Sequence, residues 1–401
     1  MCSSDLMEIL RHPDYVRQFR GKSVLCDCDD PASSGFVAFF LRQFHALGIH
    51  CLTATCKAPD GRPAFAATWH RQEDGTLRME TIPLPGDGGF DSPACIGILK
   101  EADIVCTNPP FSLWRSYVEL LYTYRKQFVI IGSLNAATYT DTFRLLRDGQ
   151  ISIGYTHPKQ FRQPDGTLKS FGNIVWFTNF DLDKRHRPLP LTRQYDGHEG
   201  LYPMYCNFDA IDCARVKDIP MDYAEGFLLP GGIPDMWPPE QYTVAAPDLS
   251  SVRPLPDRLC VLHRTTGDFV LSCGRAKEDV AARLLSMGVP ENGMRYRSGY
   301  MGVPVSYIKK ACPSQFEIIA RDRHGCADAV PIRPIGKAWC DLYFSQGNTG
   351  HMTPSMRNLV LIVDGKARQP YGRVIIRRIV GENRRFIRDS FIVCDAACSD
   401  L

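Results

Sequence analysis

Between residues 21 and 180, short apolar runs of strand length alternate with stretches in which apolar residues recur at helical spacing. The first repeat is the clearest: Val24-Leu25-Cys26 is an apolar run, a polar loop follows, and residues 35–47 have a helical periodicity that ends at Gly48. Such alternation is typical of a parallel sheet whose strands are joined by helices. We therefore predict an α/β fold, a doubly wound and mostly parallel sheet with helices on both faces.

The composition changes near residue 181. Prolines and charged residues crowd the segment up to residue 193 and again residues 230–256, as expected of linkers and surface loops. A chain of 401 residues is long enough for two domains. We predict that they comprise residues 1–185 and 186–401, the second being an α+β region with a probable insertion at about 231–298.

The composition also argues against membrane, secreted and metal-binding classes of protein. No run of about 18 apolar residues occurs, and the first residues lack the basic and then apolar pattern of a secretory signal, so we expect no membrane association. The 16 cysteines are scattered and include no CxxC pair, and we therefore expect reduced thiols and no metal site.

The strongest local motif is the tetrad Asn108-Pro109-Pro110-Phe111, which follows an apolar run at residues 103–107. An Asn carbonyl and the carbonyl of the next proline can each accept one hydrogen of an aromatic amine, which directs the nitrogen lone pair at an electrophile. Proline restricts φ, so both acceptors are held at the carboxyl end of a strand, where ligands of α/β sheets bind. Phe111 is a candidate to stack on a flipped base. The alternative is a chance Asn-Pro turn.

A second candidate site is the loop at residues 26–34, between the first predicted strand and helix. It has no GxGxxG pattern, and its Ser and Asp residues are equally explained as the N-cap of the helix. Its interpretation as a binding loop therefore depends on its context in the chain.

Three runs of the sequence supply that context: Cys26-Asp27-Cys28-Asp29-Asp30-Pro31 with Ser34, then Pro85-Gly86-Asp87-Gly88-Gly89-Phe90, then residues 101–113 around the tetrad. In order and spacing the chain resembles the EcoRI-type adenine-specific DNA methyltransferases. Further similar segments lie at residues 172–179, 201–203, 302–307 and 315–318, so the resemblance spans most of the chain.

The resemblance implies a Rossmann-like fold, S-adenosylmethionine as methyl donor, and the exocyclic amine of a flipped adenine in double-stranded DNA as substrate. It further implies catalytic roles for Asn108, Pro109, Pro110 and Phe111. The family is one of restriction-modification enzymes, which places the protein in the cytoplasm of a prokaryotic or phage-infected cell.

The resemblance also implies the residues that bind the cofactor and the base. Those expected to bind the methionine part of the cofactor are Cys28, Asp29, Asp30 and Pro31, and those expected to bind its adenine are Asp87 and Phe90. Thr53 or Thr55 stands where a ribose contact is expected. Trp176 and Phe177 stand where an aromatic side chain stacks on the flipped adenine, the alternative being that they belong to the core of the sheet.

A basic stretch extends from Lys366 to Arg388 and contains a single acid, Glu382. A solvated strand face explains it as well as contact with DNA phosphates does. On the second interpretation the phosphate ligands are Arg373, Arg377, Arg378, Arg384 and Arg385, in a target-recognition region at residues 186–401.

Two alternative functions stay open on the sequence alone. The same tetrad could bind the amino group of cytosine, or that of adenine in RNA, as the group to be methylated. A stretch like Asp-Glu-Phe-Tyr-Thr, which family members commonly carry ahead of the first strand, is absent from residues 6–21, and this leaves room for a DNA-binding protein without catalytic activity.

Overall fold

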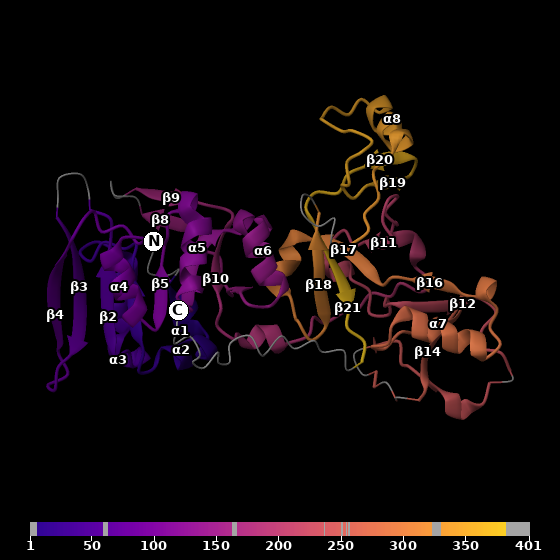
Figure 1. Ribbon diagram of the computed structural model, residues 1–401, viewed down its shortest axis with the longest axis horizontal. Helices are drawn as coiled ribbons and strands as arrows, with labels where there is room; N and C mark the ends of the chain where they lie inside the picture. The colour runs from indigo at the N-terminus through magenta and orange to yellow at the C-terminus, as the bar shows by residue number, and fades with distance from the viewer. Residues whose placement is uncertain are drawn as a thin grey trace, which may run out of the picture. The chain divides into compact units, whose positions relative to one another are not determined.

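The computed structural model describes residues 6–58, 63–162, 167–235, 237–249, 252–253, 255, 257–322 and 330–381. The chain divides into two compact units, Met1–Arg185 and His186–Leu401. In Figure 1 the first unit is coloured indigo to magenta and the second magenta to yellow. Each unit is built around its own sheets, and the two are described separately below.

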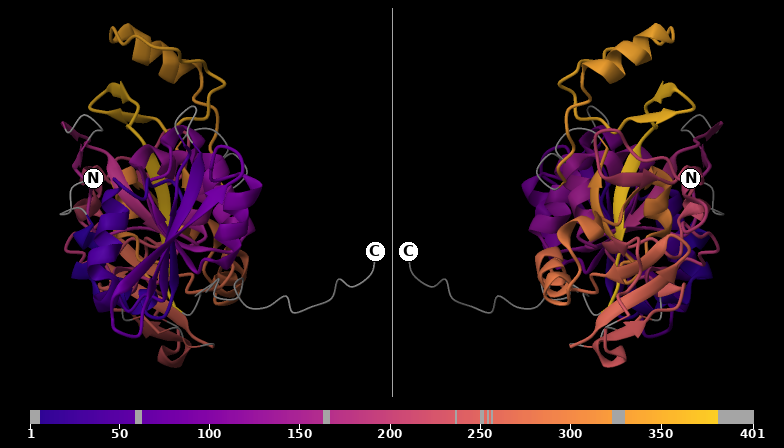
Figure 2. Two further views of the ribbon diagram at one scale, coloured as in Figure 1. Left: turned by 90° about the vertical axis from the view of Figure 1, so that its left-hand side faces the viewer. Right: turned by 90° about the vertical axis from the view of Figure 1, so that its right-hand side faces the viewer.

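An eight-stranded sheet, in the order β4-β3-β2-β1-β5-β6-β10-β7, forms the first unit. The strands are β1 (Ser23–Cys26), β2 (Cys51–Thr55), β3 (Ala64–Arg71), β4 (Leu77–Leu84), β5 (Ile104–Thr107), β6 (Gln127–Ser133), β7 (Ser152–Ile153) and β10 (Ile174–Thr178). A separate hairpin pairs β8 (Gln160–Arg162) with β9 (Leu168–Ser170). The strands of the sheet fan out in the left view of Figure 2, as a twisted sheet must.

The sheet is mixed rather than mostly parallel. β2, β1, β5 and β6 are parallel neighbours, whereas the pairs β2–β3, β3–β4, β6–β10 and β10–β7 are antiparallel. Helical crossovers connect β1 to β2 and β5 to β6, whereas a short turn joins the antiparallel strands β3 and β4. The prediction from alternating runs therefore holds for the centre of the sheet and fails at both edges.

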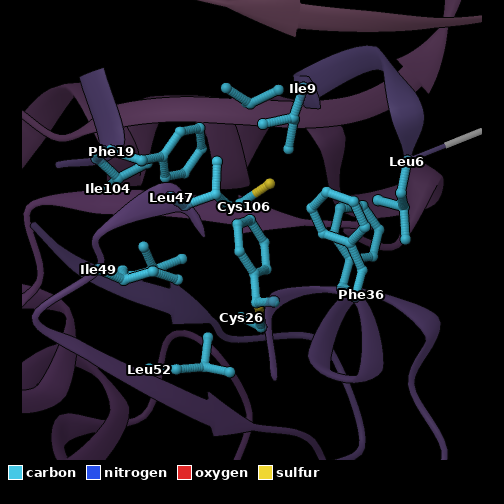
Figure 3. Packing of buried hydrophobic residues seen from close by; sticks show 14 of the residues in the cluster. Leu6, Ile9, Phe19, Cys26, Phe36, Leu47, Ile49, Leu52, Ile104 and Cys106 are labelled. Carbon is cyan, nitrogen blue, oxygen red and sulfur yellow. The ribbon is translucent and has the colours of Figure 1, made fainter. Parts of the chain in front are cut away.

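Helices cover both faces of this sheet. Those of the first unit are α1 (Met7–Arg11), α2 (Pro13–Phe19), α3 (Gly35–Leu47), α4 (Pro93–Glu101), α5 (Trp114–Thr123) and α6 (Thr140–Arg147). Phe19, Phe36 and Leu47 of α2 and α3 pack with Cys26 and Ile104 on one face (Figure 3).

On the other face α5 packs against β6 and β10, with the rings of Trp114 and Phe177 4.7 Å apart. Burial of these rings stabilises the layers by roughly 1.5–3 kcal/mol for each large side chain.

The boundaries of α3 follow from its sequence. Ser34 is the N-cap and its hydroxyl accepts a hydrogen bond of 3.0 Å from the backbone N–H of Phe36. Gly48 ends the helix in the left-handed region, at φ 65°. The loop at residues 26–34 is thus anchored at its carboxyl end by a helix cap, as the sequence analysis allowed.

Two larger sheets form the second unit. β11 (Ala210–Asp212), β17 (Tyr300–Pro304), β21 (Arg373–Arg378) and β18 (Phe316–Arg321) make a four-stranded sheet in that order. β13 (Tyr242–Val244), β14 (Leu259–Arg264), β15 (Gly267–Leu271), β12 (Gly226–Leu229) and β16 (Arg295–Arg297) make a five-stranded one. The remaining elements are α7 (Lys277–Ser286), α8 (Lys337–Ser345), β19 (Leu361–Val363) and β20 (Lys366–Arg368).

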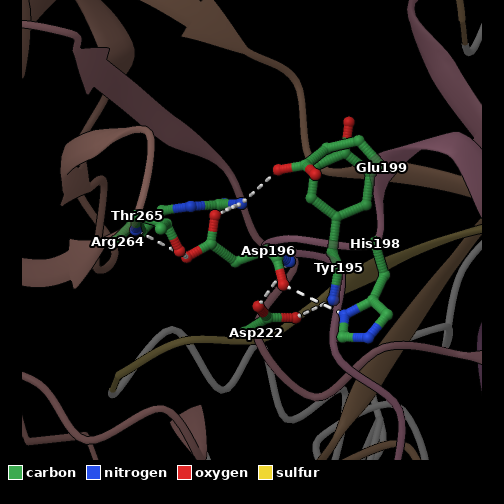
Figure 4. A network of polar contacts seen from close by, with 7 residues as sticks. All are labelled: Tyr195, Asp196, His198, Glu199, Asp222, Arg264 and Thr265. Atoms are coloured by element: carbon green, nitrogen blue, oxygen red, sulfur yellow. Dashed lines mark hydrogen bonds and ion pairs between the residues drawn. The ribbon is translucent and has the colours of Figure 1, made fainter.

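The segment predicted as an insertion, residues 231–298, does not form a sheet of its own. Two of its strands, β15 and β16, pair with β12, which precedes the segment. Arg264, at the end of β14, is also tied to the chain near residue 196: its buried side chain lies 2.9 Å from Asp196 and 3.5 Å from Glu199 (Figure 4). Asp222 in turn accepts a hydrogen bond of 3.0 Å from the backbone of Asp196. The segment is therefore an integral part of the second unit.

We expect Gly132→Ala to destabilise the protein, because a Cβ at this position of β6 would lie 2.4 Å from Cζ3 of Trp114. Overpacking of this kind costs about 1–3 kcal/mol. Gly97→Ala is the matched control, since a Cβ on this exposed residue of α4 meets nothing within 4 Å and alanine favours a helix by about 0.5–1 kcal/mol. The urea midpoint should fall for the first variant and rise slightly for the second, and an unchanged midpoint for Gly132→Ala would contradict this packing.

Candidate active site

The two motifs singled out from the sequence lie at one edge of the first unit's sheet. β1 and β5 are adjacent and parallel, with Val24 opposite Ile104 and Leu25 opposite Val105. The loop at residues 27–34 leaves the carboxyl end of β1, and Asn108 follows the carboxyl end of β5. The carboxyl ends of parallel strands are where α/β sheets bind ligands, so both motifs face the same region.

Hydrogen bonds join the two motifs through Thr107 and Asp29. The Thr107 hydroxyl donates to the Asp29 carboxylate and accepts a bond of 3.2 Å from the backbone N–H of Cys28. Asp29 also accepts a bond of 2.6 Å from the Ser34 hydroxyl and a hydrogen bond from the backbone of Asn108. Burial raises the pKa of Asp29, and these hydrogen bonds oppose that rise. Asp29 thus holds the loop against the residue that precedes the tetrad.

The tetrad presents an acceptor and an exposed ring. The Oδ1 atom of Asn108 is buried and accepts no hydrogen bond from any residue that the structure describes. Pro109 is buried, Pro110 is exposed, and Phe111 begins a short 3-10 helix with its side chain 40% exposed. A buried carbonyl oxygen without a donor costs free energy unless a ligand supplies one.

A second carboxylate, Asp27, lies buried at the end of β1. It accepts a hydrogen bond of 2.5 Å from the hydroxyl of Tyr117 on α5. Burial raises the pKa of Asp27 to about 7, although the Tyr117 bond opposes the shift. The ring of Tyr117 also meets the ring of Phe90 edge-on at 5.0 Å. Tyr117 therefore connects the loop after β1 with the loop at residues 85–90.

The loop at residues 85–90 packs on the chain that follows β2. Gly88 has φ 72°, and a Cβ there would lie 2.7 Å from the backbone oxygen of Cys56. Asp87 is exposed, accepts a bond of 3.0 Å from the backbone of Gly89, and pairs with Lys57 at 3.0 Å. The Gly89 bond, with Lys57, lowers the pKa of Asp87. Phe90 is 9% exposed.

Hydrogen bonds within the loop after β1 stabilise its conformation. Asp30 is exposed and accepts bonds of 2.9 Å from the backbone of Ala32 and from the Ser33 hydroxyl. Cys28 and Pro31 are half-buried. The loop is thus held in one conformation by its own side chains, with parts of Cys28, Asp30 and Pro31 reaching the surface.

The hydroxyls of Thr53 and Thr55, the residues predicted to contact the ribose, are both engaged by other residues of the first unit. The hydroxyls of Thr53 and Thr68 lie 3.1 Å apart across β2 and β3. Thr55 is buried and its hydroxyl donates a bond of 3.4 Å to the backbone oxygen of Asp27. Both hydroxyls therefore already bind protein atoms.

Trp176 and Phe177 belong to the core. Both are 0% exposed, and Trp176 meets Phe36 edge-on at 6.0 Å. Because no part of either ring reaches the surface, neither can stack on a base without opening the sheet, and the core interpretation fits the structure. Phe111 is left as the exposed aromatic of the candidate site.

Arg373 and Arg377, predicted to contact phosphates, pair with acids of the second unit. The Arg373 guanidinium binds both oxygens of Asp212, at 2.7 and 3.1 Å. Arg377 pairs with Glu225 at 3.0 Å and with Glu317 at 3.2 Å. Their charges are neutralised within the second unit, which leaves little to attract a phosphate.

Arg378, also predicted to contact phosphates, is likewise bound within the second unit. Its side chain is buried, and it donates to the backbone oxygens of Pro220, at 2.8 Å, and Tyr223, at 3.3 Å. Burial lowers its pKa to about 10. Arg384 and Arg385 lie outside the described residues.

Among the described residues, no cluster of three or more His, Cys, Asp or Glu side chains could hold a metal ion. No helix in that part of the chain is long and apolar enough to cross a membrane.

The sequence analysis missed Thr107 and Tyr117. Thr107 directly precedes the tetrad, so its position was a usable signal. Tyr117 lies six residues after Phe111 on α5, and nothing in the sequence pairs it with Asp27. Only the packing of α5 against the sheet brings these two side chains together.

Comparison with known proteins gives one family. The family model described as adenine-specific methyltransferase EcoRI matches residues 2–253. This match includes the whole candidate site and ends inside the segment at residues 231–298. The resemblances noted at residues 302–307 and 315–318 lie beyond it and stay predictions.

Curated relatives agree with the family model. The chain is 34% identical to Type II methyltransferase M.EcoRI of Escherichia coli, over 57% of this chain and 79% of that protein. It is 37% identical to Type II methyltransferase M.MpnI of Mycoplasma pneumoniae, over 52% of this chain and 70% of that protein. A third, M.MgeORF184P of Mycoplasma genitalium, is 30% identical over 52% and 70%. No solved structure matches the chain.

We expect Asp27→Asn to stabilise the protein at pH 8 more than at pH 5. With its pKa raised from 3.8 to about 7, Asp27 keeps a proton in the folded state that the unfolded chain has released, so folding loses stability as the pH rises toward 7. Between pH 5 and pH 8 this loss covers about two pH units, from pH 5 to the folded-state pKa of about 7, which corresponds to roughly 3 kcal/mol as an upper bound. The amide removes this loss and still accepts a bond from Tyr117. Urea midpoints at both pH values measure the effect.

Asp74→Asn is the control for this measurement. Asp74 is exposed in a turn, and the hydrogen bonds of Thr76 lower its pKa, so the variant should follow the wild type between pH 5 and 8. If Asp27→Asn showed the same pH dependence as the wild type, the buried ionisation at Asp27 would be refuted.

Proposed function

The chain belongs to the EcoRI family of adenine-specific methyltransferases, and from its candidate site we propose that it transfers a methyl group from S-adenosylmethionine to the N6 amine of adenine in double-stranded DNA. We propose that the first unit has the Rossmann-like fold of such enzymes and is the catalytic domain, residues 1–185. Residues 186–401 are then the target-recognition region. In support, every element of the candidate site described above lies in the first unit.

The observation that carries the proposal is the Oδ1 of Asn108, which is buried and has no hydrogen-bond donor among the described residues. An amino group of a base is the donor that this oxygen lacks, and the carbonyl of Pro109 is the second acceptor on the same rigid turn. With both amino hydrogens held, the nitrogen lone pair leaves conjugation with the ring and is oriented for attack. Phe111, exposed beside these acceptors, stacks on the face of the flipped base.

The residues around Asp27 and Asp29 fit a cationic cofactor. Both carboxylates are buried, and desolvation is the largest influence on each pKa. No ion pair joins either of them to a Lys or Arg in the part of the chain that the structure describes. A ligand with a positive sulfonium and a positive ammonium group compensates such carboxylates. S-adenosylmethionine has both, and when bound it supplies an electrophilic methyl group.

The chain's own residues would hold this cofactor between the two loops. Cys28, Asp29, Asp30 and Pro31 surround its methionine part, while Asp87 and Phe90 contact its adenine. Tyr117 fixes the positions of these loops relative to each other, because its ring contacts Phe90 and its hydroxyl donates to Asp27. Thr53 is not included, because its hydroxyl is engaged with Thr68.

We expect Asn108→Ala to lower the rate of methyl transfer at saturating DNA on the order of 100- to 1,000-fold, the usual effect of losing one oriented polar contact to the reacting group. Incorporation of a labelled methyl group into duplex DNA measures the rate, and calorimetry with S-adenosylmethionine should show cofactor binding retained. Ser112→Ala, an exposed neighbour, is the control.

Hydrolysis of the methylated product to nucleosides, followed by mass spectrometry, identifies the base. N6-methyl-2′-deoxyadenosine is the expected product. N4-methyl-2′-deoxycytidine, a product on RNA alone, or cofactor-independent DNA binding without any product would each overturn the proposal, and so would undiminished turnover by Asn108→Ala.

We expect Phe111→Ala to weaken base flipping on the order of 10- to 100-fold, because stacking on an aromatic ring contributes roughly 1–3 kcal/mol per base. Fluorescence of 2-aminopurine at the target adenine reports the flipped state. Leu113→Ala is the matched control, since Leu113 is 47% exposed in the same turn and has no aromatic face. Equal signals from the two variants would argue against stacking by Phe111.

A further inference from the structure

The hairpin of β8 and β9 lies at the same edge of the sheet as the candidate site. β5 and β6 are parallel, with Thr107 opposite Ile130, and β6 runs three residues further to Ser133. β10 is antiparallel to β6, so its first residue, Ile174, lies opposite Ser133. The chain between β7 and β10, which contains the hairpin, therefore emerges at this edge. It leaves β7 at Ile153, opposite Phe177, and enters β10 at Ile174, about 10 Å beyond the level of Thr107 along the strand direction.

Buried acids of the N-terminal helices anchor the first half of this connection. Glu8, 1% exposed, accepts hydrogen bonds from the backbone N–H groups of Tyr155, at 2.5 Å, and Thr156, at 2.7 Å. Asp14 accepts a bond of 2.5 Å from the Tyr155 hydroxyl. The Tyr155 ring is stacked on His12, with centroids 3.7 Å apart. The chain therefore enters the hairpin from a fixed position.

The second half is anchored to the end of β6. The backbone oxygen of Asn173 accepts a bond of 2.6 Å from the N–H of Leu134, and the Asn173 amide donates one of 3.0 Å to the Ser133 hydroxyl. Across the base of the hairpin, the N–H of Phe171 donates a bond of 2.9 Å to the oxygen of Lys159. Both ends of the connection are therefore held by hydrogen bonds to the rest of the first unit.

Two of the described residues of this hairpin segment are exposed lysines. Lys159 and Lys169 are both exposed, and Leu168 is 51% exposed. The Lys169 ammonium lies 5.4 Å from the centre of the Phe171 ring, which supports its stem. Neither lysine pairs with an acid among the described residues, in contrast to Arg373 and Arg377 of the second unit.

We propose that Lys159 and Lys169 bind backbone phosphates of the DNA duplex beside the flipped adenine, which makes this hairpin the DNA-positioning arm of the first unit. The proposal rests on the proposed function, because it takes DNA as the substrate at Asn108. Ammonium groups that have no acidic partner among the described residues, on a segment anchored at the active-site edge, are suited to fix the register of a polyanion. They carry no base specificity themselves.

The test is the salt dependence of DNA binding. Each phosphate contact contributes about 0.9 to the slope of log affinity against log salt concentration, so Lys159→Gln with Lys169→Gln should reduce the slope by about 1.8. The loss of affinity caused by the double substitution should then shrink roughly tenfold between about 50 and 200 mM salt. Fluorescence anisotropy with a labelled duplex measures both quantities.

Two further variants control the test. Lys159→Arg with Lys169→Arg keeps the charges and should keep the slope. Lys100→Gln removes an exposed lysine from the last turn of α4, at the amino end of β5 and thus the opposite edge, and should leave the slope unchanged. The double Gln variant should bind S-adenosylmethionine like the wild type and keep its maximal methylation rate at saturating DNA, with a raised KM for DNA.

An unchanged slope in the double Gln variant, with DNA methylation by the wild type intact, would overturn the hairpin proposal and leave the proposed function standing. A loss of affinity that does not vary with salt, or that the Arg variant shares, would also overturn it. If the wild type methylates no DNA, the proposed function itself fails, and the product analysis shows this independently.

Discussion

The candidate site depends on one buried contact, the hydrogen bond from the Thr107 hydroxyl to the Asp29 carboxylate. It crosses from the end of β5 to the loop after β1, and the same hydroxyl accepts from the backbone of Cys28. Neighbouring parallel strands end at the same edge but leave their loops independent. The Asp29 carboxylate accepts hydrogen bonds from both loops and thereby couples their positions. A buried carboxylate is costly without its donors, so a shift of either loop would raise the free energy of the fold.

The electrostatics of this edge are those of a site prepared for a ligand. Asp27 and Asp29 are buried with little compensation from cations, and Asn108 holds an acceptor that lacks a donor. Each of these features costs folding free energy. A cationic cofactor relieves the first cost and a base amine the second. The buried polar groups that destabilise the unliganded fold thus lie where the proposed cofactor and base would bind.

The second unit shows why a run of basic residues is a poor guide to DNA contacts. Two arginines of β21, Arg373 and Arg377, pair with Asp212, Glu225 and Glu317, which lie far from them in the sequence. The third, Arg378, is buried and donates to backbone oxygens. The described arginines of β21 are therefore bound by groups that no local window of the sequence contains. The lysines of the β8–β9 hairpin are fewer, yet their charges face solvent.

The sequence by itself determined the central strands, the helix from Gly35 to Leu47 and the two motifs at the carboxyl edge, because these depend on local periodicity, capping and short spacing. Only the tertiary structure decided the antiparallel edges of the sheet, the bond between Tyr117 and Asp27, and the burial of Trp176 and Phe177. It also decided which arginines form ion pairs with acids, such as Arg373 and Arg377. Each of these rests on contacts between residues distant in the chain, and a strand aromatic or an arginine has the same local pattern whether it faces the core, an acid or solvent.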